Sequence, residues 1–280
     1  MDRKEIANYT KFLKGSGYGT RTREEYIREI LTFLKWIKES GTSPTRALVY
    51  RMYLEHLKRQ NKTPKTVSTH LSALKTYSKF LYTTKKTKND EAKFISHPIF
   101  IHRKIKILSD REISRLRCAA AQNPLSTALL ETLLQTGMTI SEAASLKKSQ
   151  VVFVRGPKYG CIKVKNHAVP INNRLEGILH RHLTMGRANR SNNYVFPGRL
   201  SKHINVRYIR TLLDKIFRKI GLRDFYVNDL RHNFIYRQLL KKAAPATVAY
   251  WVGFKSLASL NPFLKELGKL APEKSITKEV

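Results

Sequence analysis

Residues 227–236 read Val-Asn-Asp-Leu-Arg-His-Asn-Phe-Ile-Tyr, and this stretch decides the fold of the chain. Apolar side chains recur in and just after it at spacings of three to five residues, which predicts one apolar face of an α-helix. They are Leu230, Phe234, Ile235, Leu239 and Leu240. Arg231 and His232 then lie near the N-terminal end of that helix. Because a helix start presents unpaired N–H groups and an arginine offers a planar fork of donors, the stretch predicts an anion site that suits a phosphate.

Two short motifs follow this stretch, Trp-Val-Gly-Phe at 251–254 and Asn-Pro-Phe at 261–263. Together with Asp-Leu-Arg-His at 229–232 and the Leu-Leu pair that ends the apolar run, they resemble the second signature box of the tyrosine recombinases, the phage integrase and Xer family. In that family the box runs roughly His-x-Leu-Arg-His, Leu-Leu, Leu-Gly-His, and the nucleophilic tyrosine lies nine residues after the last histidine. Counting nine from Phe254 gives Phe263.

The first signature box of the same family is matched at 136–146, where the chain reads Thr-Gly-Met-Thr-Ile-Ser-Glu-Ala-Ala-Ser-Leu. The family pattern is Thr-Gly-x-Arg-Ile-Ser-Glu-x-x-x-Leu. Almost every position agrees, but the family arginine is replaced by Thr139. The resemblance covers about residues 20–264, which implies that the chain has the family fold.

The resemblance also implies a reaction. In the family two arginines clamp the scissile phosphate, a lysine protonates the leaving 5′ oxygen, and a tyrosine attacks phosphorus to form a 3′-phosphotyrosine. Two histidine-type positions assist, and neither a metal nor another cofactor takes part. The retained candidates in this chain are Arg231, His232 and Lys165, with Lys163 as an alternative lysine on the same hairpin. The degenerate positions are Thr139 for the first arginine, Asn228 for the first histidine, Phe254 for the last histidine and Phe263 for the nucleophile.

The loss of the nucleophile is the main departure from the family. No tyrosine occurs after Tyr250, which we interpret as a core aromatic of a helix over 246–252, so a shift of register does not restore a nucleophile. Thr139 cannot make a bidentate contact to phosphate. Asn228 cannot shuttle protons near neutral pH. We therefore predict a scaffold that binds DNA and does not cut it.

The first eighty or so residues hold four apolar-periodic runs, which predicts a small helical bundle. This bundle resembles the core-binding domain of the family, through a Thr-x-x-x-Tyr helix start at 22–26, Phe-Leu-x-Trp at 33–36 and Thr-Pro-x-Thr at 63–66. Candidate contacts to DNA phosphates are Lys62, Lys65, Lys75, Lys79, Lys85 and Lys86. The alternative for each of them is an ordinary solvated lysine.

We expect a mainly α fold with a small antiparallel β-sheet. The expected parts are a helical core-binding domain over 1–84, a basic linker over 85–106, an α+β catalytic-fold domain over 107–264 and a C-terminal tail over 265–280. In the family a linker at this place lets two domains close around DNA. The sheet is predicted from β-branched runs, separated by turn signals, at 151–154, 161–164 and 168–171.

Composition points to a polyanionic partner. Lys and Arg number 54 against 20 Asp and Glu, a net charge of +34, and residues 1–107 alone hold 24 basic and 9 acidic residues. A polyanion offsets such self-repulsion, so double-stranded DNA is the expected partner. Cys118 and Cys161 lack a metal-ligand spacing, and no metal site is expected. Because neither a bilayer-length apolar run nor a signal peptide is present, we expect a cytoplasmic protein, nucleoid-associated in a prokaryote, with no membrane partner.

Three hypotheses follow. The first is an integrase-like DNA-binding protein that cannot cleave by itself and is an accessory or regulatory subunit in site-specific DNA recombination, beside an active tyrosine recombinase or as a homo-oligomer on DNA. The second is a divergent recombinase that still cleaves, in integration or excision of a mobile element, with an unusual nucleophile or a partner's tyrosine. The third is a basic RNA-binding protein, which surface aromatics for base stacking would favour.

Overall fold

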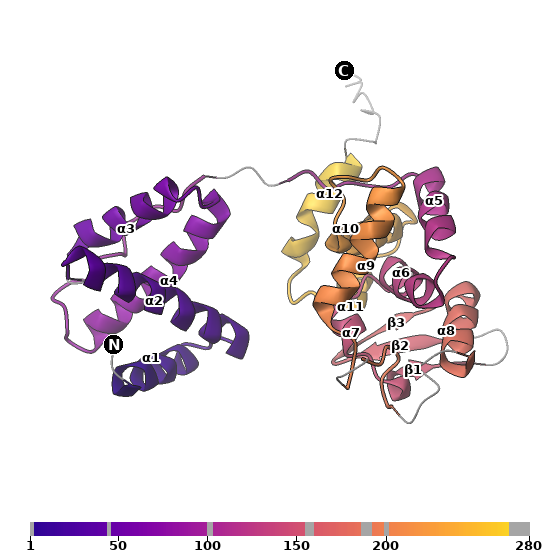
Figure 1. The fold of residues 1–280 in the computed structure, drawn as a ribbon, viewed down its shortest axis with the longest axis horizontal. Coiled ribbons are helices and arrows are strands. Elements are labelled where there is room, and N and C mark those ends of the chain that lie inside the picture. The colour runs from indigo at the N-terminus through magenta and orange to yellow at the C-terminus, as the bar shows by residue number, and fades with distance from the viewer. Residues whose placement is uncertain are drawn as a thin grey trace, which may run out of the picture. The chain divides into compact units, whose positions relative to one another are not determined.

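The computed structural model describes residues 3–43, 46–99, 103–154, 160–185, 192–198 and 202–268. The chain forms two compact units, Met1–Arg103 and Lys104–Val280 (Figure 1). Helices dominate both units, and the strands of the described ranges form one small antiparallel sheet in the second unit. The predicted fold class is therefore confirmed. None of the helices in these ranges is long and apolar enough to cross a membrane.

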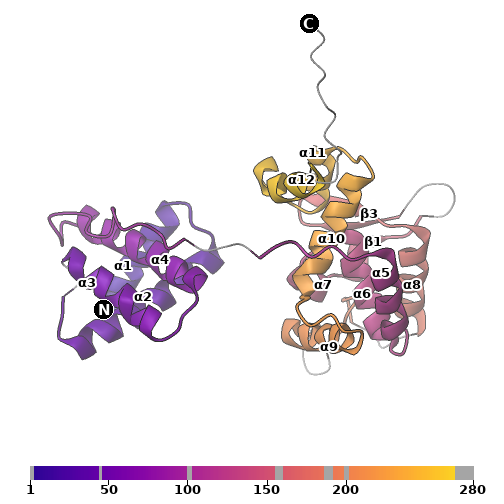
Figure 2. The ribbon, with the colours of Figure 1, turned by 90° about the horizontal axis from the view of Figure 1, so that it is seen from above.

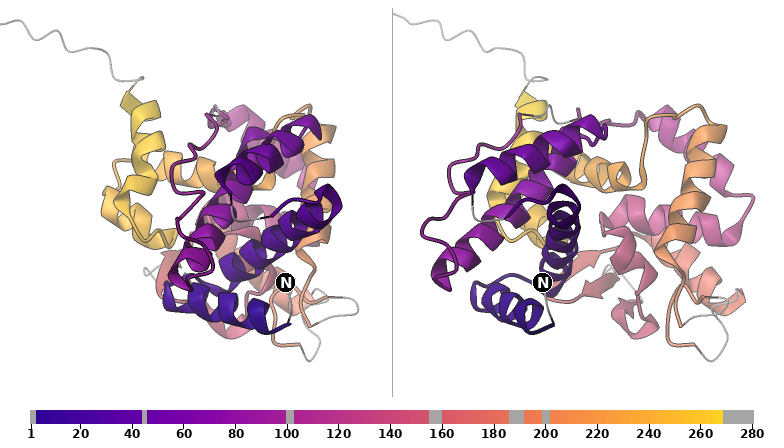
Figure 3. Two further views of the ribbon diagram at one scale, coloured as in Figure 1. Left: turned by 90° about the vertical axis from the view of Figure 1, so that its left-hand side faces the viewer. Right: turned by 60° about the vertical axis from the view of Figure 1, so that its left-hand side comes forward.

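The first unit is a bundle of four helices: α1 (Arg3–Gly15), α2 (Thr20–Ser40), α3 (Ala47–Arg59) and α4 (Pro64–Thr83). α4 is its centre, because α1, α2 and α3 each pack on it (Figure 3). Aromatic side chains fill the core, and Tyr9 and Phe33 are fully buried there. α4 begins as the Thr-Pro signature predicts, since the Thr63 hydroxyl accepts a hydrogen bond from the Thr66 backbone N–H.

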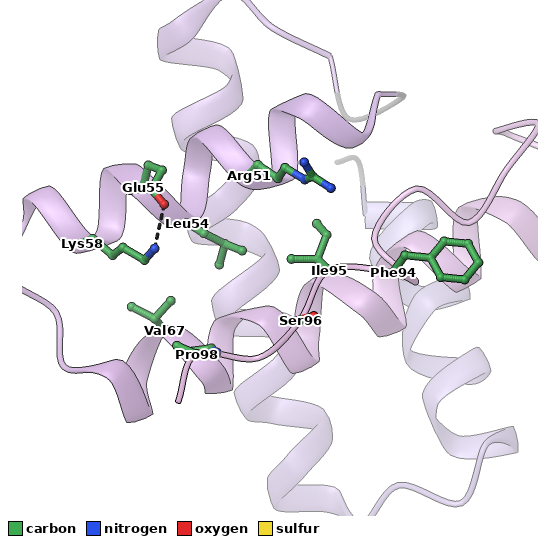
Figure 4. A pocket seen from close by; sticks show the side chains of 9 residues that line it. All are labelled: Arg51, Leu54, Glu55, Lys58, Val67, Phe94, Ile95, Ser96 and Pro98. Carbon is green, nitrogen blue, oxygen red and sulfur yellow. Dashed lines mark hydrogen bonds and ion pairs between the residues drawn. The ribbon is translucent and has the colours of Figure 1, made fainter. Parts of the chain in front are cut away.

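The stretch after α4 belongs in part to this first unit, although we expected the basic linker to begin at residue 85. Ala92 and Ile95 are buried in the core of the bundle. The Ser78 hydroxyl donates to Asp90 Oδ1 at 2.6 Å and accepts from the Ala92 N–H at 3.0 Å. Figure 4 shows the cleft that results, lined by Arg51, Leu54, Glu55, Lys58, Val67, Phe94, Ile95, Ser96 and Pro98. Buried apolar contacts thus hold the chain to the bundle as far as Ile95, and a hydrogen bond between Ser68 and His97 (2.9 Å) holds it as far as His97.

The second unit is built around α6, a helix that is buried along most of its length. Four of the longer helices pack on it: α5, α8, α9 and α10. Their bounds are Asp110–Ala120 for α5, Pro124–Thr136 for α6, Asn173–Met185 for α8, Val206–Lys219 for α9 and Val227–Leu240 for α10. Ser109 and Glu112 form a capping box that begins α5. The periodicity of the opening stretch therefore yields α10, packed against the centre of the unit.

The sheet of the second unit has the order β1-β2-β3, with β1 at Val151–Val152, β2 at Cys161–Val164 and β3 at His167–Pro170. Both pairings are antiparallel. Val164 pairs with His167, so Lys165 and Asn166 form the turn between β2 and β3. Lys165 has a φ of 47°, a left-handed conformation that is uncommon for a residue other than glycine. This tight hairpin sets the position of Lys165 at the end of the sheet.

Short helices complete the second unit. They are α7 (Ile140–Ala144), the 3₁₀ turns η1 (Lys148–Gln150) and η3 (Leu257–Leu260), α11 (Pro245–Trp251) and α12 (Asn261–Gly268). α11 and α12 pack against α10, and α11 also packs on β3 (Figure 2). α7 packs between α6 and α9. These contacts gather both signature boxes around α10.

Candidate functional site

Arg231, in the first half of α10, is the centre of the candidate site. Its Nη1 donates to the Gly137 carbonyl oxygen and its Nη2 to the Val252 carbonyl oxygen, each at 2.6 Å. Gly137 ends α6 in a left-handed conformation with a φ of 62°, and Val252 ends α11. Helix ends leave carbonyl groups without intrahelical partners. Arg231 therefore satisfies two helix ends and joins the two signature boxes.

The Arg231 guanidinium is enclosed by its surroundings. The side chain is only 9% exposed, and its Cζ lies 5.0 Å from the centroid of the Phe254 ring. Such a geometry is a cation–π contact. Burial lowers the pKa of Arg231, while the Glu142 carboxylate acts in the opposite direction, and an arginine remains a cation in either case. Phe254 thus covers Arg231 and offers no hydrogen-bond donor.

Thr139, at the position of the family's first arginine, is the N-cap of α7. Its backbone N–H donates to Glu142 Oε2 at 2.8 Å, and its hydroxyl accepts from the Glu142 backbone N–H at 3.2 Å. These two bonds form a capping box, the arrangement that Thr-x-x-Glu favours. The residue therefore begins a helix and carries no charge toward a ligand.

Asn228 and His232 lie one turn apart on α10 and contact each other. The Asn228 amide nitrogen and His232 Nε2 are 2.9 Å apart, while His232 Nδ1 lies 3.3 Å from Asp229 Oδ1. Asp229 is buried, and its other oxygen accepts from the Tyr226 backbone N–H at 2.8 Å. Asn228 and Asp229 thus contact the two ring nitrogens of His232, and the contact at Nδ1 lacks hydrogen-bond geometry.

Phe263, at the position of the family nucleophile, lies beside His232. The two ring centroids are 5.6 Å apart in a T-shaped arrangement, and Phe263 is only 4% exposed. It belongs to the core cluster shared by α10, α11 and α12. The structure therefore places Phe263, the predicted counterpart of the family nucleophile, beside His232, and its side chain presents only C–H groups.

The two candidate lysines of the hairpin have different surroundings. Lys163 is exposed on β2. Lys165, in the turn, lines a cleft of about 280 Å³ with Glu142, Tyr194 and His203. Glu142 also caps the N-terminus of α7, where Thr139 is the N-cap. The shared cleft therefore places Lys165 near the N-terminus of α7. Of the two, Lys165 has the placement closer to the site.

His167 is a site residue that the sequence analysis missed. It begins β3 and packs on Gly253, where a Cβ atom would lie 2.7 Å from His167 Cε1. Gly253 has a φ of 68°, so both the space and the backbone conformation require glycine. The pKa of His167 is lowered, by burial first and then by the Arg231 and Lys165 charges, against a raising effect of Glu142. The available signal was its place directly after the hairpin turn.

A cavity of about 240 Å³ opens beside Arg231 between α7, α9 and α10. It is lined by Met138, Thr139, Ile140, Arg210, Asp214, Tyr226, Val227, Asn228 and Arg231. Three family positions, Thr139, Asn228 and Arg231, thus face one space. Arg210 and Asp214 from α9 also line it, and the sequence analysis named neither. The signal for them was the amphipathic pattern of α9, which places charged residues opposite its buried face.

The lysines predicted to contact DNA lie on the surface of the first unit. Lys62, Lys65, Lys79, Lys85 and Lys86 are exposed, and Lys75 is partly buried. Lys86 forms an ion pair with Glu5 at 2.7 Å. The pKa of His97 is lowered, first by burial and second by the charge of Lys75. Their exposure is compatible with a role in DNA binding, which stays a prediction.

Tyr250 is 52% exposed, so our interpretation of it as a core aromatic is wrong. α11 turns its Val248 and Ala249 inward instead.

Within the described ranges, no group of three or more metal-binding side chains is present. In the described part of the chain, the candidate site is built from Arg231, His232, Phe254 and Phe263, next to a cavity that Arg231 lines together with Arg210 and Asp214.

Two family models match the chain. The one described as "Phage integrase family" matches residues 106–266, and the one described as "Phage integrase, N-terminal SAM-like domain" matches residues 6–85. Among curated proteins, tyrosine recombinase XerC of Bacillus pumilus is 27% identical over 86% of this chain and 85% of its own. Tyrosine recombinase XerD of Oceanobacillus iheyensis is 25% identical over 82% of each chain. Both of these similarities extend across the two units.

Solved structures share the fold at low sequence identity. XerH site-specific recombinase bound to its difH substrate has a TM-score of 0.70 at 17% identity, with 96% of this chain and 84% of that one covered. The Tn1549 transposon integrase in complex with circular intermediate DNA has a TM-score of 0.73 at 12% identity, with 95% and 98% covered. A lambda integrase dimer bound to a core site has a TM-score of 0.70 at 14% identity, with 94% and 95% covered.

Proposed function

The chain belongs to the phage integrase family of tyrosine recombinases, and from this premise we propose that it binds duplex DNA but does not cleave it by itself. The net charge of +34 supports a DNA partner, since phosphate contacts by Lys and Arg dominate such affinities. Structural neighbours described as bound to DNA support it as well. In this role the protein is an accessory or regulatory subunit in site-specific recombination, on DNA with an active recombinase or with a second copy.

The observation that carries this proposal is Phe263. Covalent strand cleavage needs an oxygen that attacks phosphorus, and the side chain beside His232 has none. The ring is buried and presents only C–H groups to His232. Loss of the nucleophile removes the covalent route, whatever the other residues retain.

Arg231 and Thr139, the predicted counterparts of the family's two phosphate-binding arginines, support the same proposal. Arg231 donates two of its N–H groups to backbone carbonyls, and Thr139 is a neutral helix cap. Loss of one preorganised donor to a transition state typically costs ~10²–10³ in rate. Combined with the missing nucleophile, such losses leave binding as the function that the site can still perform.

One observation favours the alternative of a divergent active recombinase. Tyr226 is 55% exposed and lines the same cavity as Arg231, Asn228 and Arg210. The phenol hydroxyl of Tyr226 is the group in this cavity that could replace the family nucleophile. A tyrosine supplied by a partner is the other form of this alternative.

Covalent trapping tests the proposal. The protein, alone and with a co-encoded recombinase, is incubated with nicked suicide duplexes from the DNA flanking its gene, then run on denaturing and native gels. A variant with Thr139→Arg, Asn228→His, Phe254→His and Phe263→Tyr is the matched control for a cleavable site. We expect a native shift but no adduct from the unaltered chain. An adduct on this chain would overturn the proposal, and its loss in Tyr226→Phe would identify the nucleophile.

A further inference from the structure

We propose that Arg210 supplies the phosphate-binding charge that position 139 lacks. It would bind a DNA backbone phosphate in the cavity between α7, α9 and α10. This inference rests on the proposed DNA binding and adds the residue and the place of one contact.

The cavity is the first support. Arg210 reaches it from α9, Thr139 from the start of α7, and Arg231 from α10. A space of about 240 Å³ is many times the ~10–15 Å³ that admits one water, so phosphate oxygens have room. Because α7 packs on α9, a charge on position 210 faces the same space that an arginine at position 139 would enter.

The donors of Arg210 are the second support. Its side chain is exposed, and in the described part of the chain no hydrogen bond or ion pair engages it. Arg231, by contrast, already donates to Gly137 and Val252. An arginine presents five donors in a fork that matches phosphate geometry. Arg210 is thus the cation of this cavity whose full fork is available.

The rigidity of α9 is the third support. The Asn205 side chain accepts from the Arg207 backbone N–H at 2.7 Å and caps the helix. Ile209 and Leu213 are fully buried on its inner face. Arg210 therefore projects from a fixed helix, so a phosphate contact requires ordering of its side chain alone.

Asp214 opposes the proposed contact and gives it a second test. It lies one turn after Arg210, is partly buried and lines the same cavity. Its carboxylate repels a phosphate placed there. Removing that charge should therefore strengthen DNA binding, whereas removing Arg210 should weaken it.

The experiment measures the dissociation constant for a random-sequence 30-bp duplex as a function of salt. We expect Arg210→Ala to weaken binding and to reduce the log–log salt slope by ~1, whatever the sequence, as loss of one phosphate contact does. Asp214→Asn should tighten binding several-fold. Arg207→Ala is the matched control, since Arg207 is exposed on the same helix but does not line the cavity.

Relocation of the charge decides whether the cavity is the place of contact. Thr139→Arg should restore affinity and salt slope in the Arg210→Ala background, whereas any loss caused by Arg207→Ala should persist when Thr139→Arg is added. Thr139→Gln, which loses the same helix cap but adds no charge, should not rescue either variant. An unchanged salt slope in Arg210→Ala, or failure of a folded Thr139→Arg double variant to rescue it, would overturn the inference. Absence of any shift with the unaltered chain would instead sink the proposed DNA binding.

Discussion

Two buried charges in the second unit, Glu131 and Arg231, are compensated in opposite ways. Glu131 in α6 is 1% exposed and is surrounded by donors. Arg117 Nε and Nη2 donate to its two oxygens at 2.6 and 3.1 Å, Arg174 Nε donates at 3.2 Å, and Gln135 Nε2 at 2.6 Å. This carboxylate thus has counter-charges from α5 and α8. We call Glu131 and its three donor side chains the closed network, because the Glu131 charge is compensated within it.

Arg231 is compensated only in part, because the Glu142 carboxylate acts on its charge without forming an ion pair with it. Among the residues that the structure describes, its donors go to two neutral carbonyls, and no carboxylate forms an ion pair with it. Carbonyl dipoles and the Phe254 ring offset only part of a full positive charge. Because this charge borders an open cavity, part of its potential remains available to an anion. A buried carboxylate with ion-pair partners stabilises the fold, whereas a buried cation without an ion-pair partner is a candidate site for an anionic ligand.

Of the variants that test this comparison, Glu131→Ala should have the largest effect on the free energy of unfolding. We expect it to lower the free energy of unfolding by about 3 kcal/mol, because it leaves Arg117 and Arg174 without their shared partner. Arg174 is 55% exposed and can be rehydrated, which limits the loss. Urea unfolding in a Trp36→Phe background measures it, since Trp251 then reports on the second unit alone. Asp110→Ala, which breaks a pair with Arg237 in the same unit and whose carboxylate is 92% exposed, should change stability by no more than ~1 kcal/mol.

A loss below about 1 kcal/mol in Glu131→Ala would contradict the structural role of this network. DNA binding at fixed salt should be little changed in the same variant. A large loss of DNA affinity in a folded Glu131→Ala protein would mean that the closed network is also part of the site.

The second effect concerns Arg231→Met, which keeps the side-chain volume but removes the donors. We expect a loss of about 2 kcal/mol in the free energy of unfolding, since two buried carbonyls lose a charged donor. The same fluorescence measurement applies. Arg210→Ala is the control, because an exposed arginine without a protein partner should change stability by no more than ~0.5 kcal/mol. If both arginine variants behave alike, Arg231 does not join the two signature boxes.

The sequence predicted the frame of the site better than its contacts. The spacing of apolar residues predicted α10, because this pattern depends on neighbours within one or two turns. The acceptors of Arg231 lie 94 and 21 residues away, and no local pattern encodes them. Thr139-x-x-Glu142 is itself a capping signature, but we read Thr139 only as a lost arginine. The exposure of Tyr250 likewise depends on how α11 packs, which periodicity over seven residues does not settle.

The smallest expected effect, a shift in the pKa of His167, is the most direct measure of the Arg231 charge. His167 titrates within reach of Arg231, and burial, Arg231 and Lys165 lower its pKa while Glu142 raises it. Arg231→Met removes one lowering charge, so it should raise the pKa of His167 toward the ordinary value, followed by NMR titration of the imidazole. Arg231→Lys keeps the charge and should leave the pKa of His167 close to that of the unaltered protein.

The same titration links the charge to stability and to the ligand. A histidine whose folded pKa is lowered takes up its proton more readily when unfolded, so stability is lost as pH falls below the unfolded value of ~6.5. Raising the pKa of His167 should therefore reduce the acid sensitivity of Arg231→Met relative to its own stability at pH 8. A bound DNA phosphate should raise the pKa of His167 in the unaltered protein in the same direction. If Arg231→Met leaves the pKa of His167 unchanged, the charge of Arg231 is already compensated and its difference from Glu131 disappears.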